Sequence, residues 1–264
     1  MPATGHDRPG LPKEIARAIG DRPLGALVRS ATGTTTCTVG GALAEFYLKS
    51  GPMDGPNPLS EDIRRLDWLK ERRADAPHLV AYCEEEGTGF LLMTALPGEP
   101  ASAVAARTPE RLPLRAIAQA LRRFHDLPLP CPFDAGPGGL LDRARRRLER
   151  GFVDPASFDP ERLGMDPARL LQRLTATLPG ETRGAVVHGD ATLDNVIIVG
   201  DAVSGFVDVG RLGVGDRHND LAIMERSLRH RVSAAAAEAF LSEYGRDDLD
   251  PARMLWYRQL DEFF

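Results

Sequence analysis

The sequence predicts an α+β protein of two lobes: a small N-terminal antiparallel sheet lobe with one helix and a larger, mainly helical C-terminal lobe. Between about residues 23 and 95, short runs of Thr, Val, Leu and Phe are interrupted by glycines, which is typical of a sheet of short strands. After the connector Leu96-Pro97-Gly98, apolar residues recur every three or four positions, as on the buried faces of helices. We therefore expect one lobe over residues 1–95 and a second over residues 96–264.

The N-terminal lobe is expected to follow the order β-β-β-α-β-β. Its strand signals are β-branched or apolar runs bounded by glycines: Val28–Val39 (two strands around a turn), Ala44–Lys49, His78–Cys83 and Gly89–Thr94. The helical stretch opens at Ser60, a residue type that favours helix starts. This arrangement predicts one helix inserted between the third and fourth strands.

The C-terminal lobe carries five stretches with helical spacing. These are Pro113–His125, Leu140–Arg150, Pro167–Leu178, Ser233–Tyr244 and a last one from Pro251 toward Leu260. Asp250 directly before Pro251 is a capping residue followed by proline at the first helical position. A strand-rich island, Ala185–Val209, lies among these helices and is predicted to end on a strand that reaches Asp208.

Composition excludes several classes of protein. With 42% hydrophobic and 27% charged residues, the chain is neither disordered nor membrane-spanning, and its net charge of −5 disfavours a general polyanion partner. The basic run from Arg143 to Arg150 lacks interleaved aromatic residues, so we interpret it as a solvated helix face rather than a nucleic-acid site. No signal peptide is evident and the three cysteines have no metal-ligand spacing, so we expect a cytoplasmic protein, a monomer or weak dimer.

The segment Val186–Ala222 contains the densest chemical signal. Asp190 stands in a turn after a short apolar strand, Asn195 follows five residues later, and Asp208 lies on the far arm of the next hairpin. A carboxylate with a carboxamide suits a hard cation such as Mg²⁺, and a further carboxylate nearby could accept a hydroxyl proton. Although each residue alone is an ordinary turn former, the joint spacing HGDxxxxN, DxG and DxxxDLA predicts phosphoryl transfer.

This segment resembles the catalytic loop and metal-binding segment of the aminoglycoside phosphotransferases, which are relatives of the protein kinases. Three further segments are similar to the aminoglycoside 3′-phosphotransferase (kanamycin kinase) branch: Cys131-Pro132-Phe133-Asp134, Val203–Gly213 and the ending Leu260–Phe264 (LDEFF). The resemblance implies a two-lobed protein-kinase-like fold with ATP and Mg²⁺ as cofactors. It also implies that Asp190 is the catalytic residue and that Asn195 and Asp208 bind Mg²⁺.

On the nucleotide side, the resemblance implies that Lys49 contacts the α- and β-phosphates and that Tyr47 stacks on adenine. The remaining cofactor-binding positions are those of the phosphate-covering loop and the hinge: Thr32, Gly33, Thr94, Ala95 and Leu96. Asp62 stands where the family has a helix glutamate that pairs with the strand lysine. Because Asp is one methylene shorter, Glu61 remains the alternative partner for Lys49.

On the substrate side, the positions that match aminoglycoside-contacting residues are Asp159, Asp190, Arg211, Glu262 and Phe264. Acidic side chains suit polycationic aminoglycosides because they form charge-assisted hydrogen bonds with ammonium groups. Two positions depart from the family. Pro160 and Ser227 both stand where an acidic residue is usual, with Glu225 close to the second.

The expected function is ATP-dependent phosphorylation of the 3′-hydroxyl of an aminoglycoside, with antibiotic resistance as its outcome. Two alternatives stay open. A kinase of the same fold could act on another hydroxyl compound, such as a sugar, an amino alcohol or a macrolide, and would then tolerate loss of Glu262–Phe264. A nucleotide-binding module without transfer activity is the second alternative, but it would not need the complete set of Lys49, Asp190, Asn195 and Asp208.

Overall fold

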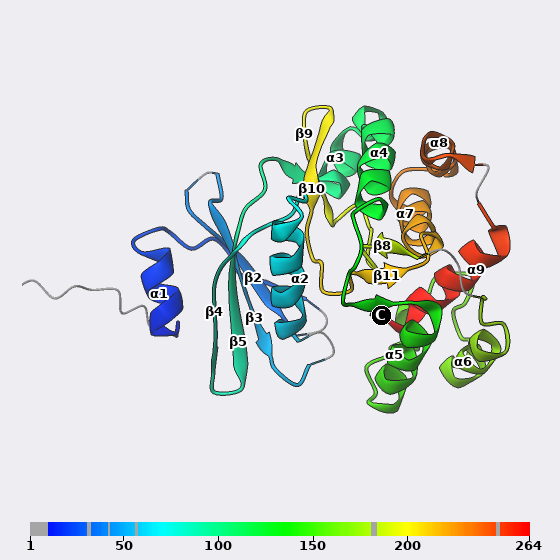
Figure 1. Ribbon diagram of the computed structural model, residues 1–264, viewed down its shortest axis with the longest axis horizontal. Helices are drawn as coiled ribbons and strands as arrows, with labels where there is room; N and C mark the ends of the chain where they lie inside the picture. The colour runs from blue at the N-terminus through cyan, green and yellow to red at the C-terminus, as the bar shows by residue number, and fades with distance from the viewer. Residues whose placement is uncertain (1–9, 31–32, 42, 56–57, 181–183, 247–248) are drawn as a thin grey trace, which may run out of the picture. The chain divides into compact units, whose positions relative to one another are not determined.

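The computed structural model describes residues 10–30, 33–41, 43–55, 58–180, 184–246 and 249–264. The chain forms two compact units, Met1–Pro97 and Gly98–Phe264, whose elements are labelled in Figure 1. The predicted lobe boundary, between residues 95 and 96, lies in the same connector. Thr32, one of the predicted cofactor-binding residues, lies outside the described residues.

The N-terminal unit is built on a five-stranded antiparallel sheet. Its strands are β1 (Val28–Arg29), β2 (Thr35–Val39), β3 (Phe46–Pro52), β4 (Leu79–Glu85) and β5 (Thr88–Thr94), in the spatial order β1-β2-β3-β5-β4. Helix α2 (Ser60–Glu71) follows β3. The predicted order of strands and helix over this region is therefore confirmed.

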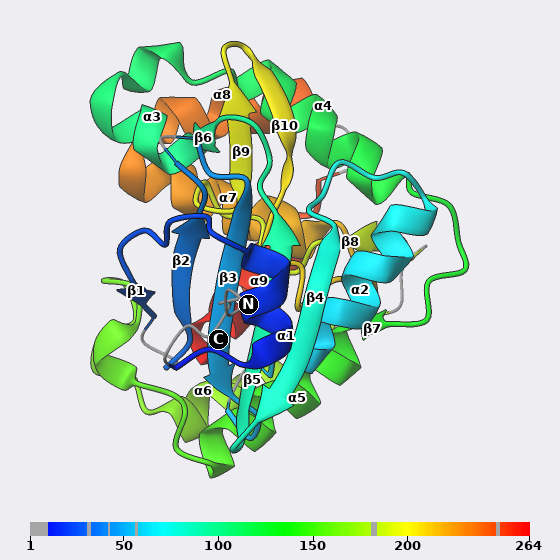
Figure 2. The same cartoon turned by 90° about the vertical axis from the view of Figure 1, so that its left-hand side faces the viewer.

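Helix α1 (Lys13–Ile19) was not predicted from the sequence. Its seven residues are too few for an apolar period to emerge, yet Ile15 and Ile19 are fully buried and join Leu48 and Leu92 of the sheet in one apolar cluster. Figures 1 and 2 show α1 and α2 on opposite sides of the sheet. Burial against the sheet, rather than helix propensity, stabilises this short helix.

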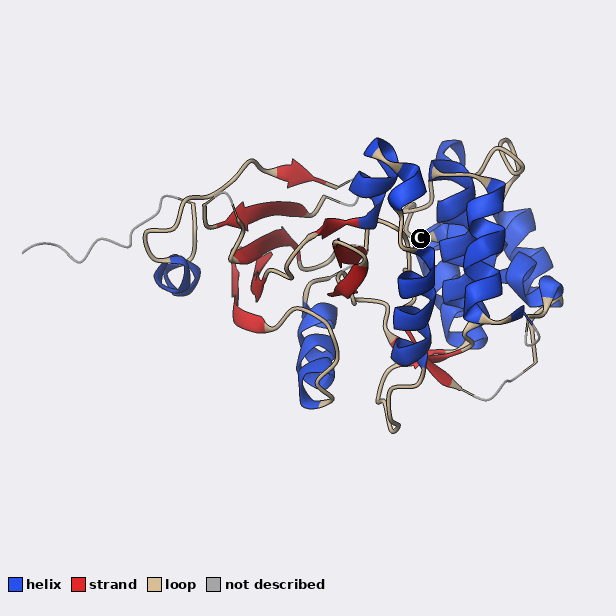
Figure 3. Cartoon of the chain, turned by 90° about the horizontal axis from the view of Figure 1, so that it is seen from above, coloured by secondary structure: helices blue, strands red, loops and turns tan. Residues whose placement is uncertain are grey.

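The C-terminal unit is mainly helical, as the blue ribbons of Figure 3 show. Its helices are α3 (Ala101–Arg107), α4 (Leu114–His125), α5 (Pro137–Glu149), α6 (Pro167–Ala176), α7 (His218–Arg231), α8 (Ala234–Tyr244) and α9 (Pro251–Leu260), with short 3₁₀ turns at Pro109–Arg111, Pro155–Ser157 and Asp261–Phe263. The five predicted helices are present. Asp250 caps α9 by accepting the backbone N–H of Ala252 at 2.9 Å, which confirms the expected N-cap.

Helices α3 and α7 were missed by the sequence analysis. In α7 the buried set includes polar residues, namely His218, Asn219, Asp220 and Glu225, as well as apolar ones. Since this helix contacts both α8 and α9, it is buried on more than one side and lacks the two-faced pattern that sequence periodicity detects. The missed helix is the one that carries Asp220, a residue central to the site described below.

Two small three-stranded sheets complete this unit. One has the order β10 (Ala202–Phe206), β9 (Val196–Val199), β6 (Glu99–Pro100), and the other has the order β7 (Asp134–Ala135), β11 (Gly213–Gly215), β8 (Ala185–Val187). The expectation that a strand reaches Asp208 was wrong. Strand β10 ends at Phe206, and Asp208 lies in the following loop with a φ of 61°.

Within the described part of the chain, no helix combines the length and the hydropathy that crossing a bilayer requires.

Candidate active site

The loop after β8 is held by one buried carboxylate. Asp220, fully buried near the start of α7, accepts the backbone N–H groups of His188 and Gly189 with its two oxygens, each at 2.7 Å. One of these oxygens also lies 3.0 Å from Nε2 of His125, the last residue of α4, whose Nδ1 contacts the Tyr244 hydroxyl at 2.6 Å. This buried network fixes the backbone immediately before Asp190.

Gly189 permits the loop after β8 to pass close to the backbone of Arg211. Its φ is 82°, in the left-handed region that side chains rarely adopt, and a Cβ there would lie 2.6 Å from the carbonyl oxygen of Arg211. The loop therefore requires glycine for both conformation and space. His188 adds a contact of 2.9 Å from its Nε2 to the carbonyl of Val207.

Asp190 and Asn195 are connected through the loop backbone. The Asn195 side-chain NH₂ donates to the carbonyl of Asp190 at 2.8 Å, and its backbone carbonyl accepts from Val207 N–H at 3.0 Å. Asp208 follows Val207 directly, so the β9–β10 hairpin brings Asn195 and Asp208 to the same end. The structure thus places Asp190, Asn195 and Asp208 on one loop system, as the motif predicted.

These residues fit a Mg²⁺ ion. Because the amide NH₂ of Asn195 is turned toward Asp190, its oxygen faces the other way as an available oxygen ligand, and the exposed Asp208 carboxylate follows on the neighbouring loop. In the described residues no group of three or more His, Cys, Asp and Glu side chains forms a metal cage. A two-ligand site completed by water and phosphate oxygens is the usual coordination for Mg²⁺.

The loop that carries Asp190 is linked to the last residues of the chain through Arg211. One of its guanidinium nitrogens lies 3.7 Å from Asp190 and 3.6 Å from Asp261, and its guanidinium stacks 4.9 Å from the centre of the Phe264 ring. The Asp190 side chain keeps 27% of its surface exposed. It is therefore held in place from one side while remaining open to a substrate hydroxyl.

A second cluster of charges joins the loop after the 3₁₀ turn Pro155–Ser157 to the chain end. Glu262 accepts the backbone N–H of Asp159 at 3.1 and 3.2 Å from its two oxygens. Arg162 bonds both carboxylates, and Arg226 of α7 bonds Asp159 at 2.8 Å. Asp159 and Glu262, two of the predicted substrate residues, thus lie together, but each is already paired with an arginine of this chain.

Burial dominates the electrostatics of this cluster. It raises the pKa of Asp261 above the ordinary range even though Arg211 and Arg226 act in the opposite direction. Burial also raises the pKa of Glu262, against the hydrogen bond from Arg162. For Arg226, burial lowers the pKa, but the carboxylates of Asp261 and Asp159 outweigh it and leave the value raised. The site is therefore a desolvated network of opposite charges.

The sequence is similar to those of known phosphotransferases. Residues 34–257 match the model of the phosphotransferase enzyme family. The chain is 33% identical to an aminoglycoside 3′-phosphotransferase of Escherichia coli, over 83% of this chain and 82% of that protein. The chain belongs to the aminoglycoside phosphotransferase family. It is also 35% identical to a streptomycin 3″-kinase of Streptomyces griseus, over 83% of this chain and 84% of that protein.

Solved structures agree with this family assignment. The crystal structure of an aminoglycoside-3′-phosphotransferase of type VIII has a TM-score of 0.82 and 34% identity, covering 93% of this chain and 94% of that one. A phosphotransferase of Streptomyces rimosus in complex with ADP and streptomycin has a TM-score of 0.76 and 29% identity, over 90% and 92% of the two chains. The predicted α+β fold of protein-kinase type is confirmed.

The positions predicted for the nucleotide side belong to the N-terminal unit. Tyr47 and Lys49 stand two residues apart on β3, so they share one face of the sheet, and Leu48 between them is buried on the other. Gly33, with a φ of 86°, forms the turn between β1 and β2, where its N–H donates to Ser30 at 3.1 Å. Tyr47 is 36% exposed, so its ring is not buried in the apolar core.

Glu61 and Asp62, the two acidic residues in the first turn of α2, differ in exposure. The Glu61 side chain is 55% exposed and bonds Arg65 at 2.5 Å, whereas Asp62 is only 7% exposed. In the hinge, the N–H groups of Thr94 and Ala95 donate to the carbonyls of His78 and Glu45, both at 2.9 Å. Because those two N–H groups already donate within the unit, the predicted hydrogen bonds from the hinge to adenine would have to use Leu96 N–H or backbone carbonyl oxygens.

The two positions predicted to depart from the family pattern, Pro160 and Ser227, differ in setting. Pro160 is exposed next to Asp159. Ser227 accepts the backbone N–H of Leu193 at 3.1 Å, so its hydroxyl serves the catalytic loop. Glu225 does not replace the missing acid at 227, because it is buried and paired with Arg229 at 2.7 Å and with Arg258 at 3.4 Å.

The expectation that the basic run from Arg143 to Arg150 forms a solvated helix face is wrong for Arg147. Arg147 is buried and donates to the carbonyls of Phe263 at 2.6 Å and Phe264 at 3.2 Å, so it anchors the chain end instead of facing solvent. Burial and the nearby Arg211 lower the pKa of Arg147 to about 10. Arg146 and Arg150 of the same run are exposed, as expected.

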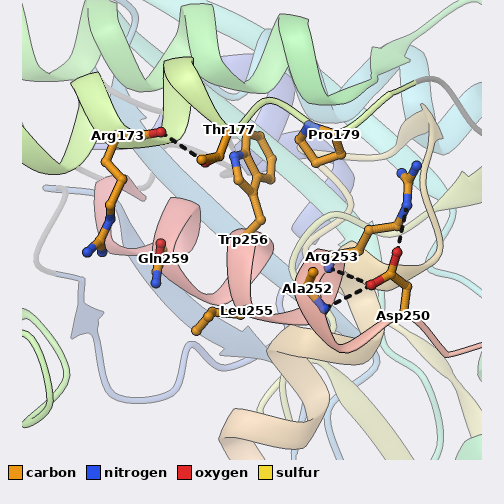
Figure 4. A pocket seen from close by; sticks show the side chains of 9 residues that line it. All are labelled: Arg173, Thr177, Pro179, Asp250, Ala252, Arg253, Leu255, Trp256 and Gln259. Atoms are coloured by element: carbon orange, nitrogen blue, oxygen red, sulfur yellow. Dashed lines mark hydrogen bonds and ion pairs between the residues drawn. The ribbon is translucent and has the colours of Figure 1, made fainter.

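Sequence reasoning also missed Arg162 and Arg226, because their partners lie up to 100 residues away and no motif marks them. A cavity of about 470 Å³ lies elsewhere in this unit, between the end of α6 and α9 (Figure 4). Trp256 and Arg253 line it, and the indole N–H of Trp256 donates to the carbonyl of Leu174 at 3.1 Å. None of the predicted site residues lines this cavity.

Proposed function

We propose that the protein transfers the γ-phosphoryl group of ATP to a hydroxyl of an aminoglycoside, with the 3′-hydroxyl as the first candidate. The observation that carries the proposal is the position of Asp190. Its backbone is fixed by the buried Asp220 network, Asn195 is bonded to its carbonyl, and Arg211 connects it to the acidic chain end. Because ATP and reduced cysteines belong to the cytoplasm, we place the reaction there.

Asp190 orients the substrate hydroxyl and accepts its proton as the oxygen attacks the phosphorus in line with the leaving group. The partly exposed carboxylate can reach a hydroxyl, and Arg211 limits its rotation. Mg²⁺, held by Asn195 and Asp208, would neutralise the phosphate charge when bound. Positioning and charge stabilisation therefore account for the rate, and no covalent intermediate on the protein is needed.

On the nucleotide side, we assign Lys49 to the α- and β-phosphates and Tyr47 to the adenine ring, because both project from one face of β3. Asp62 is the carboxylate assigned to hold Lys49, since Glu61 is exposed and engaged by Arg65. Leu96 N–H is assigned as the hinge donor. The turn at Gly33, with Thr32, is assigned to cover the phosphates.

The substrate side is assigned to the carboxylates that meet at the chain end: Asp159, Asp261 and Glu262. Ammonium groups of an aminoglycoside would bond these oxygens in a desolvated setting, where charge-assisted hydrogen bonds are strongest. Arg211 and the ring of Phe264 form an adjoining surface of the same site. Phosphorylation adds negative charge to the drug and weakens its binding to RNA, so the cellular outcome is resistance.

The 3″-hydroxyl of streptomycin is a second candidate acceptor. It is supported by the streptomycin 3″-kinase relative, which is as similar to this chain as the 3′-phosphotransferases are. Identity alone therefore does not separate the two hydroxyls. The missing acidic residues at Pro160 and Ser227 are consistent with a substrate that carries fewer ammonium groups than kanamycin or neomycin.

The deciding experiment incubates purified protein with Mg-ATP and kanamycin, neomycin, streptomycin or 3′-deoxygenated tobramycin. ADP release and the mass of each drug are measured. Gain of one phosphate by kanamycin but not by tobramycin assigns the 3′-hydroxyl, and gain by streptomycin alone assigns the second candidate. If no drug gains phosphate while ATP is hydrolysed or bound, the proposal is wrong and another hydroxyl compound is the acceptor.

Asp190→Ala is the matched control for chemistry. It should abolish transfer while leaving ATP affinity unchanged, because ATP is assigned to other residues. Loss of ATP affinity as well would mean that Asp190 holds the loop together, and its assigned role would be wrong.

A further inference from the structure

Arg162 occupies an unusual place among the charges at the chain end. Its side chain is only 6% exposed, and different nitrogens of its guanidinium bond the carboxylates of Asp159 and Glu262. These are two of the carboxylates assigned above to the ammonium groups of the substrate. A cation of the protein itself thus occupies the oxygens that a cationic substrate would use.

We propose that Arg162 is an internal competitor of the substrate, whose guanidinium must leave Asp159 and Glu262 before an ammonium group can bind them. Arg162 is then a specificity-determining residue that weakens the binding of highly charged aminoglycosides. The inference rests on the proposed function. It extends that function by identifying a residue of this chain that restricts the range of substrates.

The charge balance of the cluster supports this inference. Three carboxylates, Asp159, Asp261 and Glu262, face three guanidinium groups, those of Arg162, Arg211 and Arg226. Within these six groups the opposite charges balance, and Asp190, 3.7 Å from Arg211, is the neighbouring carboxylate that adds one negative charge. Release of one guanidinium makes the net charge more negative by one at the point where an ammonium group would bind.

The three arginines differ in how they are held. Arg226 projects from helix α7 and bridges Asp159 and Asp261, while Arg211 is stacked on the Phe264 ring. Arg162 lies instead in a turn outside the long helices, where its N–H donates to the carbonyl of Asp159 at 2.7 Å. A rotation of its side chain need not disturb a helix.

The chain also offers an acceptor for the displaced guanidinium. The carboxylate of Glu161, next in sequence, lies 3.5 Å from one Arg162 nitrogen and is 79% exposed. A short rotation would carry the guanidinium from the buried pair to this solvent-facing carboxylate. Displacement therefore breaks the two buried ion pairs of Arg162 but keeps its contact with Glu161, and Asp159 remains paired with Arg226.

The test compares Arg162→Gln with Arg253→Gln, a control that removes another arginine bonded to a largely buried carboxylate, Asp216, outside the assigned site. Both variants lose ion pairs, three at Arg162 and two at Arg253, and should melt at a lower temperature. We expect only Arg162→Gln to lower the KM for kanamycin, by about ten-fold, with an equal or larger fall for neomycin and an unchanged KM for ATP. An unchanged or raised KM for both drugs would overturn the proposal and make Arg162 a structural clasp.

Glu161 supplies a second test in a variant that keeps the buried pairs. Glu161→Gln should raise the KM for kanamycin about two- to three-fold, because the displaced guanidinium loses its acceptor. The same substitution in the Arg162→Gln background should have no effect. An equal effect in both backgrounds would mean that Glu161 attracts the drug directly, and displacement toward it would be wrong.

Two further arms keep the inference separate from the proposed function. If Arg162→Gln does not fold, Arg162→Lys retains one charge but cannot bridge both carboxylates, and it should lower the KM by a smaller factor. If the wild-type protein phosphorylates no aminoglycoside, spermine serves as the polycation, and its effect on Tm is measured without ATP. A larger spermine-induced rise in Arg162→Gln than in the wild type and Arg253→Gln supports displacement, and equal rises overturn it.

Discussion

Asp220 of α7 accepts the backbone N–H of Gly189 at 2.7 Å, thirty-one residues earlier in the chain. The same carboxylate accepts His188 N–H and contacts the His125 ring, so three groups converge on one fully buried side chain. Removing its charge would leave donors facing an amide that cannot accept from all of them. Asp220 thus positions the catalytic loop without touching a reactant.

Asp220→Asn should therefore lower both stability and turnover. We expect a loss of about 3 kcal/mol in the free energy of unfolding and a fall in kcat that exceeds any change in the KM for ATP. Urea unfolding and steady-state kinetics check this. Asp166→Asn is the control, because Asn replaces Asp as the cap of α6 equally well, and it should change neither quantity. A stable Asp220→Asn enzyme with normal kcat would refute the role of the network.

Gly189→Ala should be much more damaging than Gly200→Ala. Both glycines have a positive φ, 82° and 56°, but a Cβ at 189 would meet the Arg211 carbonyl oxygen at 2.6 Å, whereas a Cβ at 200 has nothing within 4 Å. We expect about 1 kcal/mol of destabilisation at 200 and a further 1–3 kcal/mol at 189. Thermal unfolding and transfer rates of the two variants measure the difference, and equal losses would contradict the steric argument.

Asp208→Asn should weaken Mg²⁺ binding and slow transfer by about 10²–10³-fold. The exposed carboxylate lies in the loop just beyond β10, and its replacement by an amide keeps the size of the side chain but removes the charge assigned to the metal. Titration of the rate with Mg²⁺ should show a higher half-saturating concentration. Asp201→Asn, in the turn of the same hairpin, should leave the titration unchanged. An unaltered Mg²⁺ dependence in Asp208→Asn would remove Asp208 from the metal site.

Asp216 gives a pH-dependent contribution to stability. Burial raises its pKa, but hydrogen bonds from His218 and Arg253 outweigh burial and hold the pKa below its ordinary value of 3.8. A lowered folded pKa stabilises the protein above the unfolded value, and this contribution is lost as pH falls through the folded pKa. Asp216→Asn should therefore cost about 3 kcal/mol at pH 7 and progressively less below pH 3.8. Urea unfolding across this range measures it, and a constant difference would contradict the prediction.

Much of the fold was predictable because its signals are local. The five strands of the N-terminal sheet and the caps and spacings of α4, α5, α6, α8 and α9 are written in residues close together in sequence. Helix α7 was not, because burial on several sides replaces its apolar period with a mixture of polar and apolar residues. Helix α1 was too short to show a period, and it depends on the sheet that buries Ile15 and Ile19.

The sequence by itself was enough to predict the chemistry, because Asp190, Asn195 and Asp208 lie within nineteen positions and their joint spacing predicts phosphoryl transfer. Only the tertiary structure decided which arginines pair with the carboxylates of Asp159 and Glu262. Arg147, Arg162 and Arg226 reach carboxylates or carbonyls that lie from 3 to 117 residues away, and no local pattern records such pairs. Pairing of buried charges depends on which side chains packing brings together, and that is a property of the folded chain.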